Sequence, residues 1–130
     1  MIRGEIPTPS MCSTLPMQLV EVEKGRVVFH ASANEKHLNP MGGVHGGFAA
    51  TVLDSVTGCV IHSMLEVGVG YGTIDLSIKM TRPIPRDEVI IAEGTIVNLS
   101  KSLGISEAKL KNKEGKLLAT ATATCMILSN

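Results

Sequence analysis

VHGGFAATVLDSVTGCVIHSMLE, residues 44–66, is the only part of this 130-residue sequence long and unbroken enough to form a substantial helix. At about 100° per residue, its apolar side chains surround nearly the whole helix. A helix that is apolar on all sides is normally enclosed by the fold. We therefore expect the rest of the chain to cover it.

The segments around this helix have the alternating pattern of β-strands. The predicted strands cover residues 17–23, 26–32, 71–80, 89–99, 103–111 and 116–128. Strands interrupted by one helix predict an α+β fold, with an antiparallel sheet wrapped around the central helix. Residues 1–16, rich in Pro, Ser and Thr, are expected to form an irregular or short helical arm, and residues 17–130 a single domain.

Composition excludes several classes of function. Twelve basic residues balance twelve acidic ones, so the chain lacks the positive excess that nucleic acid or an anionic membrane requires. No apolar run approaches the length of a membrane span. Cys12, Cys59 and Cys125 form no CxxC pair, and the N-terminus lacks a secretory signal. We expect reduced thiols and a cytoplasmic protein.

Asp54 is the anomaly of the helix, because it interrupts an apolar surface with no Lys or Arg within one turn. Burying an unpaired carboxylate is costly, so a buried acid is usually paired, protonated or catalytic. We expect Asp54 to be buried and functional. The alternative is that it faces solvent through a gap in the sheet or caps a neighbouring element.

The residues at the helix start suggest a site for a developing negative charge. Gly46 and Gly47 would present unpaired backbone N–H groups there, and the missing Cβ atoms would let a ligand approach. The alternative is that the glycines serve packing alone. His45 could equally be a capping residue, and Asn39, which precedes Pro40, either a turn starter or a group that orients water.

Taken together, NPMGGVHGGF at residues 39–48, followed by Ala50, Leu53 and Asp54, resembles the hotdog-fold thioesterases of the phenylacetate-degradation and arthrobacterial hydroxybenzoyl-CoA types. The spacing of Asn39, His45 and Asp54 matches the family arrangement of Asn, His-Gly-Gly and helix acid. The resemblance implies a hotdog fold and the hydrolysis of acyl-CoA, with an aryl or medium-chain acyl group, to free acid and coenzyme A.

The resemblance also implies a role for each matching residue. Asp54 would act as general base or nucleophile, a choice that the sequence leaves open. The Gly46 amide would polarise the thioester carbonyl, supported by His45 and Gly47, and Asn39 would position water. Thr73, near the start of the next strand, matches a Ser or Thr of the family with looser spacing.

Further expectations concern ligands and partners. The resemblance implies a dimer joined edge to edge, with each active site completed by both chains, and commonly a dimer of dimers. Coenzyme A phosphates would need surface cations, for which Arg82, Lys101 and the nearby Ser102 are candidates by position. The four histidines show no zinc spacing, so no metal and no cofactor other than substrate coenzyme A is expected.

Two alternatives remain. A hotdog enoyl-CoA hydratase or dehydratase uses an Asp and His pair before the helix, and this loop offers His37 but no Asp. A non-catalytic acyl-CoA-binding module would keep the pocket without the chemistry, although binding alone does not require a buried acid. A serine hydrolase is excluded because no serine lies in a Gly-x-Ser-x-Gly motif.

Overall fold

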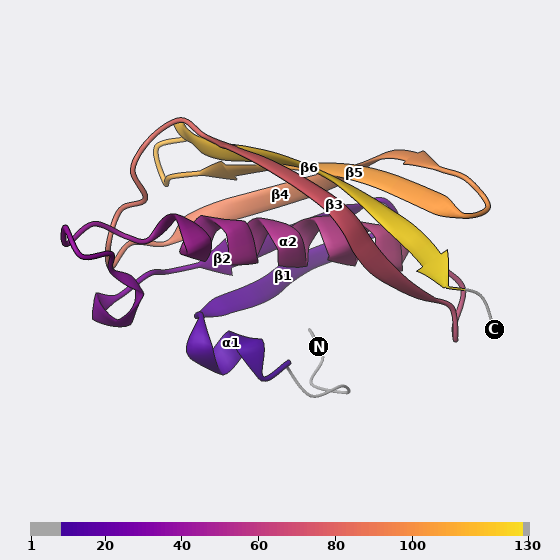
Figure 1. The fold of residues 1–130 in the computed structure, drawn as a ribbon, viewed down its shortest axis with the longest axis horizontal. Coiled ribbons are helices and arrows are strands. Elements are labelled where there is room, and N and C mark those ends of the chain that lie inside the picture. The colour runs from indigo at the N-terminus through magenta and orange to yellow at the C-terminus, as the bar shows by residue number, and fades with distance from the viewer. Residues whose placement is uncertain (1–8, 129–130) are drawn as a thin grey trace.

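The computed structural model describes residues 9–128, in which a six-stranded sheet packs against one side of a long helix (Figure 1). Its helices are α1 (Met11–Thr14), the 3-10 helix η1 (Glu35–His37) and α2 (Gly46–Ser63). Its strands are β1 (Met17–Glu23), β2 (Arg26–Ala31), β3 (Gly70–Met80), β4 (Ile90–Leu99), β5 (Leu103–Lys111) and β6 (Leu117–Leu128). No helix among these residues is long and apolar enough to cross a membrane.

The six strands form one antiparallel sheet in the order β1-β2-β4-β5-β6-β3. β1 and β3 are therefore the edge strands, although the chain enters β3 directly from α2. β3 pairs along its whole length with β6, and the two strands lie side by side across the helix (Figure 1). The predicted α+β architecture is confirmed.

Small residues on the inner face of the sheet let it approach α2 closely. Gly94 of β4 lies so near the helix that an added Cβ would be 2.7 Å from methyl groups of both Val56 and Val60. On β6 the inward positions Ala119, Ala121 and Ala123 are buried. These small residues let α2 approach the sheet, while larger strand side chains such as Phe29, Ile90 and Leu110 complete the core around it.

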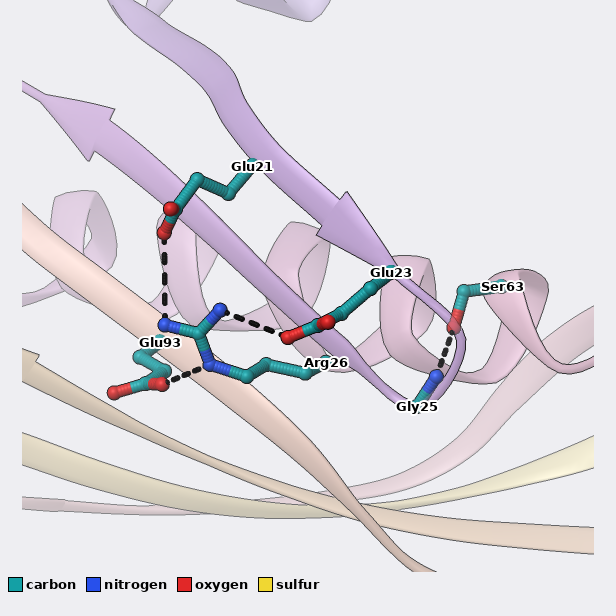
Figure 2. Close-up of polar contacts among 6 residues, drawn as sticks. All are labelled: Glu21, Glu23, Gly25, Arg26, Ser63 and Glu93. Atoms are coloured by element: carbon teal, nitrogen blue, oxygen red, sulfur yellow. Dashed lines mark hydrogen bonds and ion pairs between the residues drawn. The ribbon is translucent and has the colours of Figure 1, made fainter.

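The β1–β2 hairpin is fixed to the end of α2 (Figure 2). Gly25 adopts a left-handed φ of 85° in the turn, and its N–H donates to Ser63 Oγ at 2.9 Å. Beside it, the guanidinium of Arg26 on β2 binds the carboxylates of Glu21 and Glu23 on β1 and of Glu93 on β4. These contacts hold the edge strand β1 and the β1–β2 turn against the C-terminal end of α2.

The structure moves several predicted boundaries. α2 begins at Gly46 instead of residue 44, because His45 is extended (φ −61°, ψ 135°) and caps the helix. It ends at Ser63 instead of residue 66. The strands differ from their predicted ranges by one residue at most at either end. Part of the predicted arm is the short helix α1; residues 1–8, and 129–130 of the predicted domain, lie outside the described residues.

Candidate active site

The start of α2 leaves one backbone donor unused. His45 Nδ1 accepts a hydrogen bond from the Gly47 N–H at 2.8 Å, and the His45 carbonyl accepts one from the Phe48 N–H at 2.9 Å. Among residues 9–128 the Gly46 N–H has no hydrogen-bond partner. The capping interpretation of His45 is therefore correct, and its effect is to leave Gly46 as the free donor at the positive end of the helix.

Asn39 shapes the turn that leads to this donor. Its Oδ1 accepts from the N–H groups of Met41 at 2.9 Å and Gly43 at 3.1 Å. Its backbone N–H donates to the Gly43 carbonyl at 2.7 Å. The turn thus uses the side-chain oxygen, while the Nδ2 group donates to no other described residue. An amide in this state can still donate to a water or a ligand.

A cavity of about 350 Å³ opens beside Gly46. It is lined by Val44, Gly46, Met80, Thr81, Arg82, Pro83 and Ile84. The Met80 thioether packs directly on Gly46, because an added Cβ there would lie 3.2 Å from Sδ. Arg82 is exposed at the rim, and its Nη1 donates to the Leu117 carbonyl at 2.7 Å. The structure therefore brings Gly46 and Arg82 together.

Asp54 is exposed in this chain, so the expectation that it is buried was wrong. The sheet covers only one side of α2, and Asp54 lies on the uncovered side, as in the alternative of a gap in the sheet. Its carboxylate forms no ion pair with any described residue. The helix pattern could not reveal this, because apolar residues on α2 extend beyond the area that one sheet can cover.

Cys125 and Tyr71 lie within electrostatic range of the Asp54 carboxylate, and Thr73 lies beside Cys125. Thr73 pairs with Cys125 in the sheet, and Thr73 Oγ1 is 3.7 Å from the Cys125 thiol. Burial and the nearby Asp54 carboxylate raise the pKa of Cys125, against the opposing hydrogen bond from Thr73. Burial, then Cys59, Cys125 and Asp54, raise the pKa of Tyr71. β3 thus carries Thr73 and Tyr71 into the neighbourhood of the acid.

The acid and the free amide do not meet within one chain. Eight residues separate Gly46 from Asp54 on one helix, which corresponds to about 12 Å along the axis. A single carbonyl group cannot contact both. The candidate residues therefore fall into two separate groups, called half-sites below: one around Gly46 with Asn39 and His45, and one around Asp54 with Thr73.

Lys101 and Ser102 are exposed in the turn between β4 and β5. The Ser102 carbonyl accepts from the Ile127 N–H at 2.8 Å, which attaches this turn to the end of β6. Through β6 the turn lies at the Tyr71 end of β3, because Met126 pairs with both Leu103 and Gly72. Arg82 follows the opposite end of β3, so one chain keeps these candidate cations apart.

His37 has a structural role. Its Nδ1 accepts from the Asn34 N–H at 3.0 Å, and its Nε2 lies 2.9 Å from the Thr14 carbonyl. The buried ring packs against Phe48 with ring centroids 5.0 Å apart. Since both nitrogens bind backbone groups, His37 is not available as the histidine of a hydratase.

Sequence reasoning did not identify Tyr71, Met80 or Cys125 near the half-sites. All three lie on β3 or β6, and their positions depend on long-range strand pairing. The sequence offered one indication that Tyr71 lies near the site: it is the only tyrosine of the chain and lies two residues before the candidate Thr73.

An antiparallel sheet around one helix, with an acid on the helix and a free amide at its start, defines the class of hotdog thioesterases. A family model described as the thioesterase superfamily matches residues 41–119, more than half of the chain. The chain belongs to this family, as the resemblance implied.

Individual relatives agree with this assignment. A phenylacetic acid degradation-related protein of Ralstonia eutropha JMP134 is 32% identical, with a TM-score of 0.88 over 97% of this chain and 96% of that one. Acyl-coenzyme A thioesterase 13 of Homo sapiens is 29% identical over 107 residues, 82% of this chain and 76% of that protein. A hypothetical thioesterase of Streptococcus pneumoniae TIGR4, solved with coenzyme A, shares the fold at 24% identity, with a TM-score of 0.80 over 88% of this chain and 87% of that one.

Proposed function

We propose that this thioesterase hydrolyses acyl-CoA to a free acid and coenzyme A, with Asp54 driving the attack and the Gly46 amide polarising the carbonyl. The observation that carries the proposal is the free N–H of Gly46, left unused because His45 takes the neighbouring donor. A preorganised N–H aimed at a carbonyl oxygen stabilises the charge that develops there. The coenzyme A bound by the pneumococcal thioesterase supports this substrate class.

Two routes remain open for Asp54. As a general base, its carboxylate takes a proton from water while the water oxygen bonds to the acyl carbon. As a nucleophile, the carboxylate itself bonds to that carbon, and water then hydrolyses the resulting anhydride. In both routes the C–S bond breaks and the coenzyme A thiolate leaves and takes up a proton. Asn39 Nδ2 is the proposed donor that orients the water.

A second copy of the chain would bring the half-sites together. β3 is a long edge strand with exposed Ile74 (57%) and Met80 (53%), and such an edge is suited to pairing with another strand. Antiparallel pairing of two β3 strands about an axis midway between Thr73 and Met80 would set these residues of opposite chains side by side. Gly46, in contact with Met80, would then approach the partner's Asp54.

The same pairing would gather the proposed phosphate-binding groups. Arg82 of one chain, just beyond Met80, would come to the end of the other chain that carries Lys101 and Ser102. Exposed cations at such a position suit the phosphates of coenzyme A. The thioester arm would then run from this surface to Gly46, with Gly47 and Thr73 beside it.

The proposal also covers higher assembly, cofactors and the cellular compartment. We expect the dimers to associate further into a dimer of dimers, and the reaction to need neither a metal nor a cofactor. The free thiols of Cys12, Cys59 and Cys125 support a reducing compartment such as the cytoplasm.

A thiol-release assay over aryl, short, medium and long acyl-CoAs tests this function. Wild type should release coenzyme A from at least one class, and Asp54→Ala should lower kcat by about 10²- to 10⁴-fold with an unchanged circular dichroism spectrum. Glu114→Ala, at an exposed acid in the turn between β5 and β6, serves as the matched control. Full activity of Asp54→Ala would refute the role of the acid.

The alternatives predict different results in the same assay. A non-catalytic module would bind acyl-CoA saturably without releasing thiol. A hydratase would add water to an enoyl-CoA. The histidine that this reaction would need is not available, because both ring nitrogens of His37 bind backbone groups.

A further inference from the structure

Two hydroxyl groups are buried in the apolar core between α2 and the sheet. Thr57 of α2 and Ser106 of β5 are both 0% exposed. The inward positions on either side of Ser106 hold the small residues Gly104 and Ala108. An alanine at position 106 would fill the same place without needing a partner, because a buried hydroxyl is costly unless it is hydrogen-bonded. The two hydroxyls therefore do more than fill space.

Both hydroxyls bind carbonyl groups in the turn of α2 that carries Asp54. Thr57 Oγ1 donates to the Leu53 carbonyl at 2.8 Å and also to the Asp54 carbonyl at 3.2 Å. Ser106 Oγ donates to the Thr57 carbonyl at 2.9 Å. Among residues 9–128, this is the only hydrogen bond from a strand side chain to the backbone of α2. The central strand β5 is thus attached to the helix at the turn of the acid.

The backbone of this turn determines where the Asp54 carboxylate lies. The carboxylate forms no ion pair with any described residue, so no cationic side chain fixes its direction. Asp54 is on the uncovered side of α2, whereas Thr57 and Ser106 lie on the covered side. A threonine hydroxyl that donates four residues back competes with the backbone N–H for the same carbonyl and bends the helix locally. A change in that bend would turn the Asp54 side chain.

The proposed hydrolysis depends on this direction, because the carboxylate must meet an acyl carbon polarised by Gly46 of another chain. A misplacement of about 1 Å in such a geometry can lower the rate by about 100-fold. We propose that Thr57 and Ser106 are positioning residues, which set the turn of α2 at Asp54 and so aim its carboxylate at the thioester. This inference rests on the proposed acyl-CoA hydrolysis and adds two buried residues that act through Asp54 without touching the substrate.

Two substitutions at position 57 separate the hydroxyl from packing. Thr57→Val keeps the branched shape and removes the donor, whereas Thr57→Ser keeps the donor and removes a buried methyl group. In steady-state thiol release, Thr57→Val should lower kcat by about 10- to 100-fold with KM nearly unchanged. Thr57→Ser should keep most of the wild-type kcat although its thermal midpoint falls. The reverse order of kcat would show that packing matters and would overturn the role of the hydroxyl.

Ser106→Ala removes the second donor and leaves the Thr57 carbonyl with the bond that it accepts inside the helix. Its kcat should fall by about 10-fold, again with KM nearly unchanged. Combined with Thr57→Val, the total loss should be smaller than the product of the two single losses, because both residues act on one turn. A loss equal to that product would overturn their joint role. If Thr57→Val does not fold, Ser106→Ala decides the question alone.

Ser63→Ala is the matched control. Its hydroxyl also binds a carbonyl of α2 and accepts from the Gly25 N–H, but at the C-terminal end of the helix, away from Asp54. Its thermal midpoint should fall while kcat stays at the wild-type value. Wild-type kcat in Thr57→Val and Ser106→Ala, both folded by circular dichroism, would overturn the positioning role while the proposed function stands. Wild type that releases no thiol from any acyl-CoA would overturn both.

Discussion

Gly46 occupies the first position of α2, where a backbone N–H is normally unpaired and where proline is well tolerated. Gly46→Pro therefore removes the proposed catalytic donor with little expected cost to the helix. The preceding His45 is already extended, as a residue before proline should be. We expect kcat to fall by about 10²- to 10³-fold in steady-state thiol release, with the thermal midpoint nearly unchanged.

Gly46→Ala is the matched control, because it keeps the N–H and adds a methyl group that only the flexible end of Met80 must avoid. Its kcat should stay much closer to wild type. Equal kcat in the proline and alanine variants would show that the amide is not the electrophile.

At the residue scale, the local part of the site could be predicted from the sequence. The side-chain hydrogen bonds of Asn39 and His45 go to residues within four positions along the chain, so the spacing carries the information. The exposure of Asp54 could not be predicted, since it depends on which strands cover α2. Tyr71 and Met80 reach the helix only through the pairing of β3 with β6, which no local pattern encodes.

Among the elements, the contact between β4 and α2 is the tightest point to test. Gly94→Ala would place a methyl group 2.7 Å from both Val56 and Val60. We expect this overpacking to lower the free energy of unfolding by about 1–3 kcal/mol in urea denaturation. Gly70→Ala is the control, because its added Cβ would meet only ordinary van der Waals contact with Leu128 at 3.9 Å. Equal stability of the two variants would contradict the close packing.

The elements themselves were largely predictable. The apolar length of α2 and the alternation of the strands identified all six strands and the long helix. The start of α2 was misplaced because His45 caps the helix, its ring Nδ1 accepting a hydrogen bond from the Gly47 N–H. The sheet order, with β3 crossing to the far edge beyond β6, requires long-range packing that alternation does not specify.

For the whole molecule, buried thiols link stability to pH. Burial raises the pKa of Cys59, so the folded chain holds its thiol proton more tightly than the unfolded chain does. Above the ordinary thiol pKa the unfolded chain loses this proton first, and stability falls as pH rises toward the folded pKa. At neutral pH the Cys59 thiol is protonated in both states, so its full contribution to the free energy of unfolding is present.

We therefore expect the thermal midpoint of wild type to fall between about pH 8 and about pH 10, and the fall to be smaller in Cys59→Ala. Cys12 and Cys125, whose pKa values burial also raises, should account for part of the remaining fall. Melting curves of both proteins at several pH values provide the comparison. A parallel decline in the two would exclude Cys59 as a source.

Because Gly46 and Asp54 are separated along one helix, the proposed reaction requires two chains to form each active site. If the Asp54 carboxylate of one chain works with the Gly46 amide of another, a chain without the acid and a chain without the amide should restore activity when they form a heterodimer. One of the two sites in such a heterodimer combines the intact Asp54 with the intact Gly46.

The most direct measurement is thiol release by a heterodimer of Asp54→Asn and Gly46→Pro chains, purified through two different tags after co-refolding. Each parent alone should be nearly inactive, and the heterodimer should recover about half of the wild-type turnover per dimer. A heterodimer no more active than its parents, or chains that form no dimer, would contradict the two-chain active site.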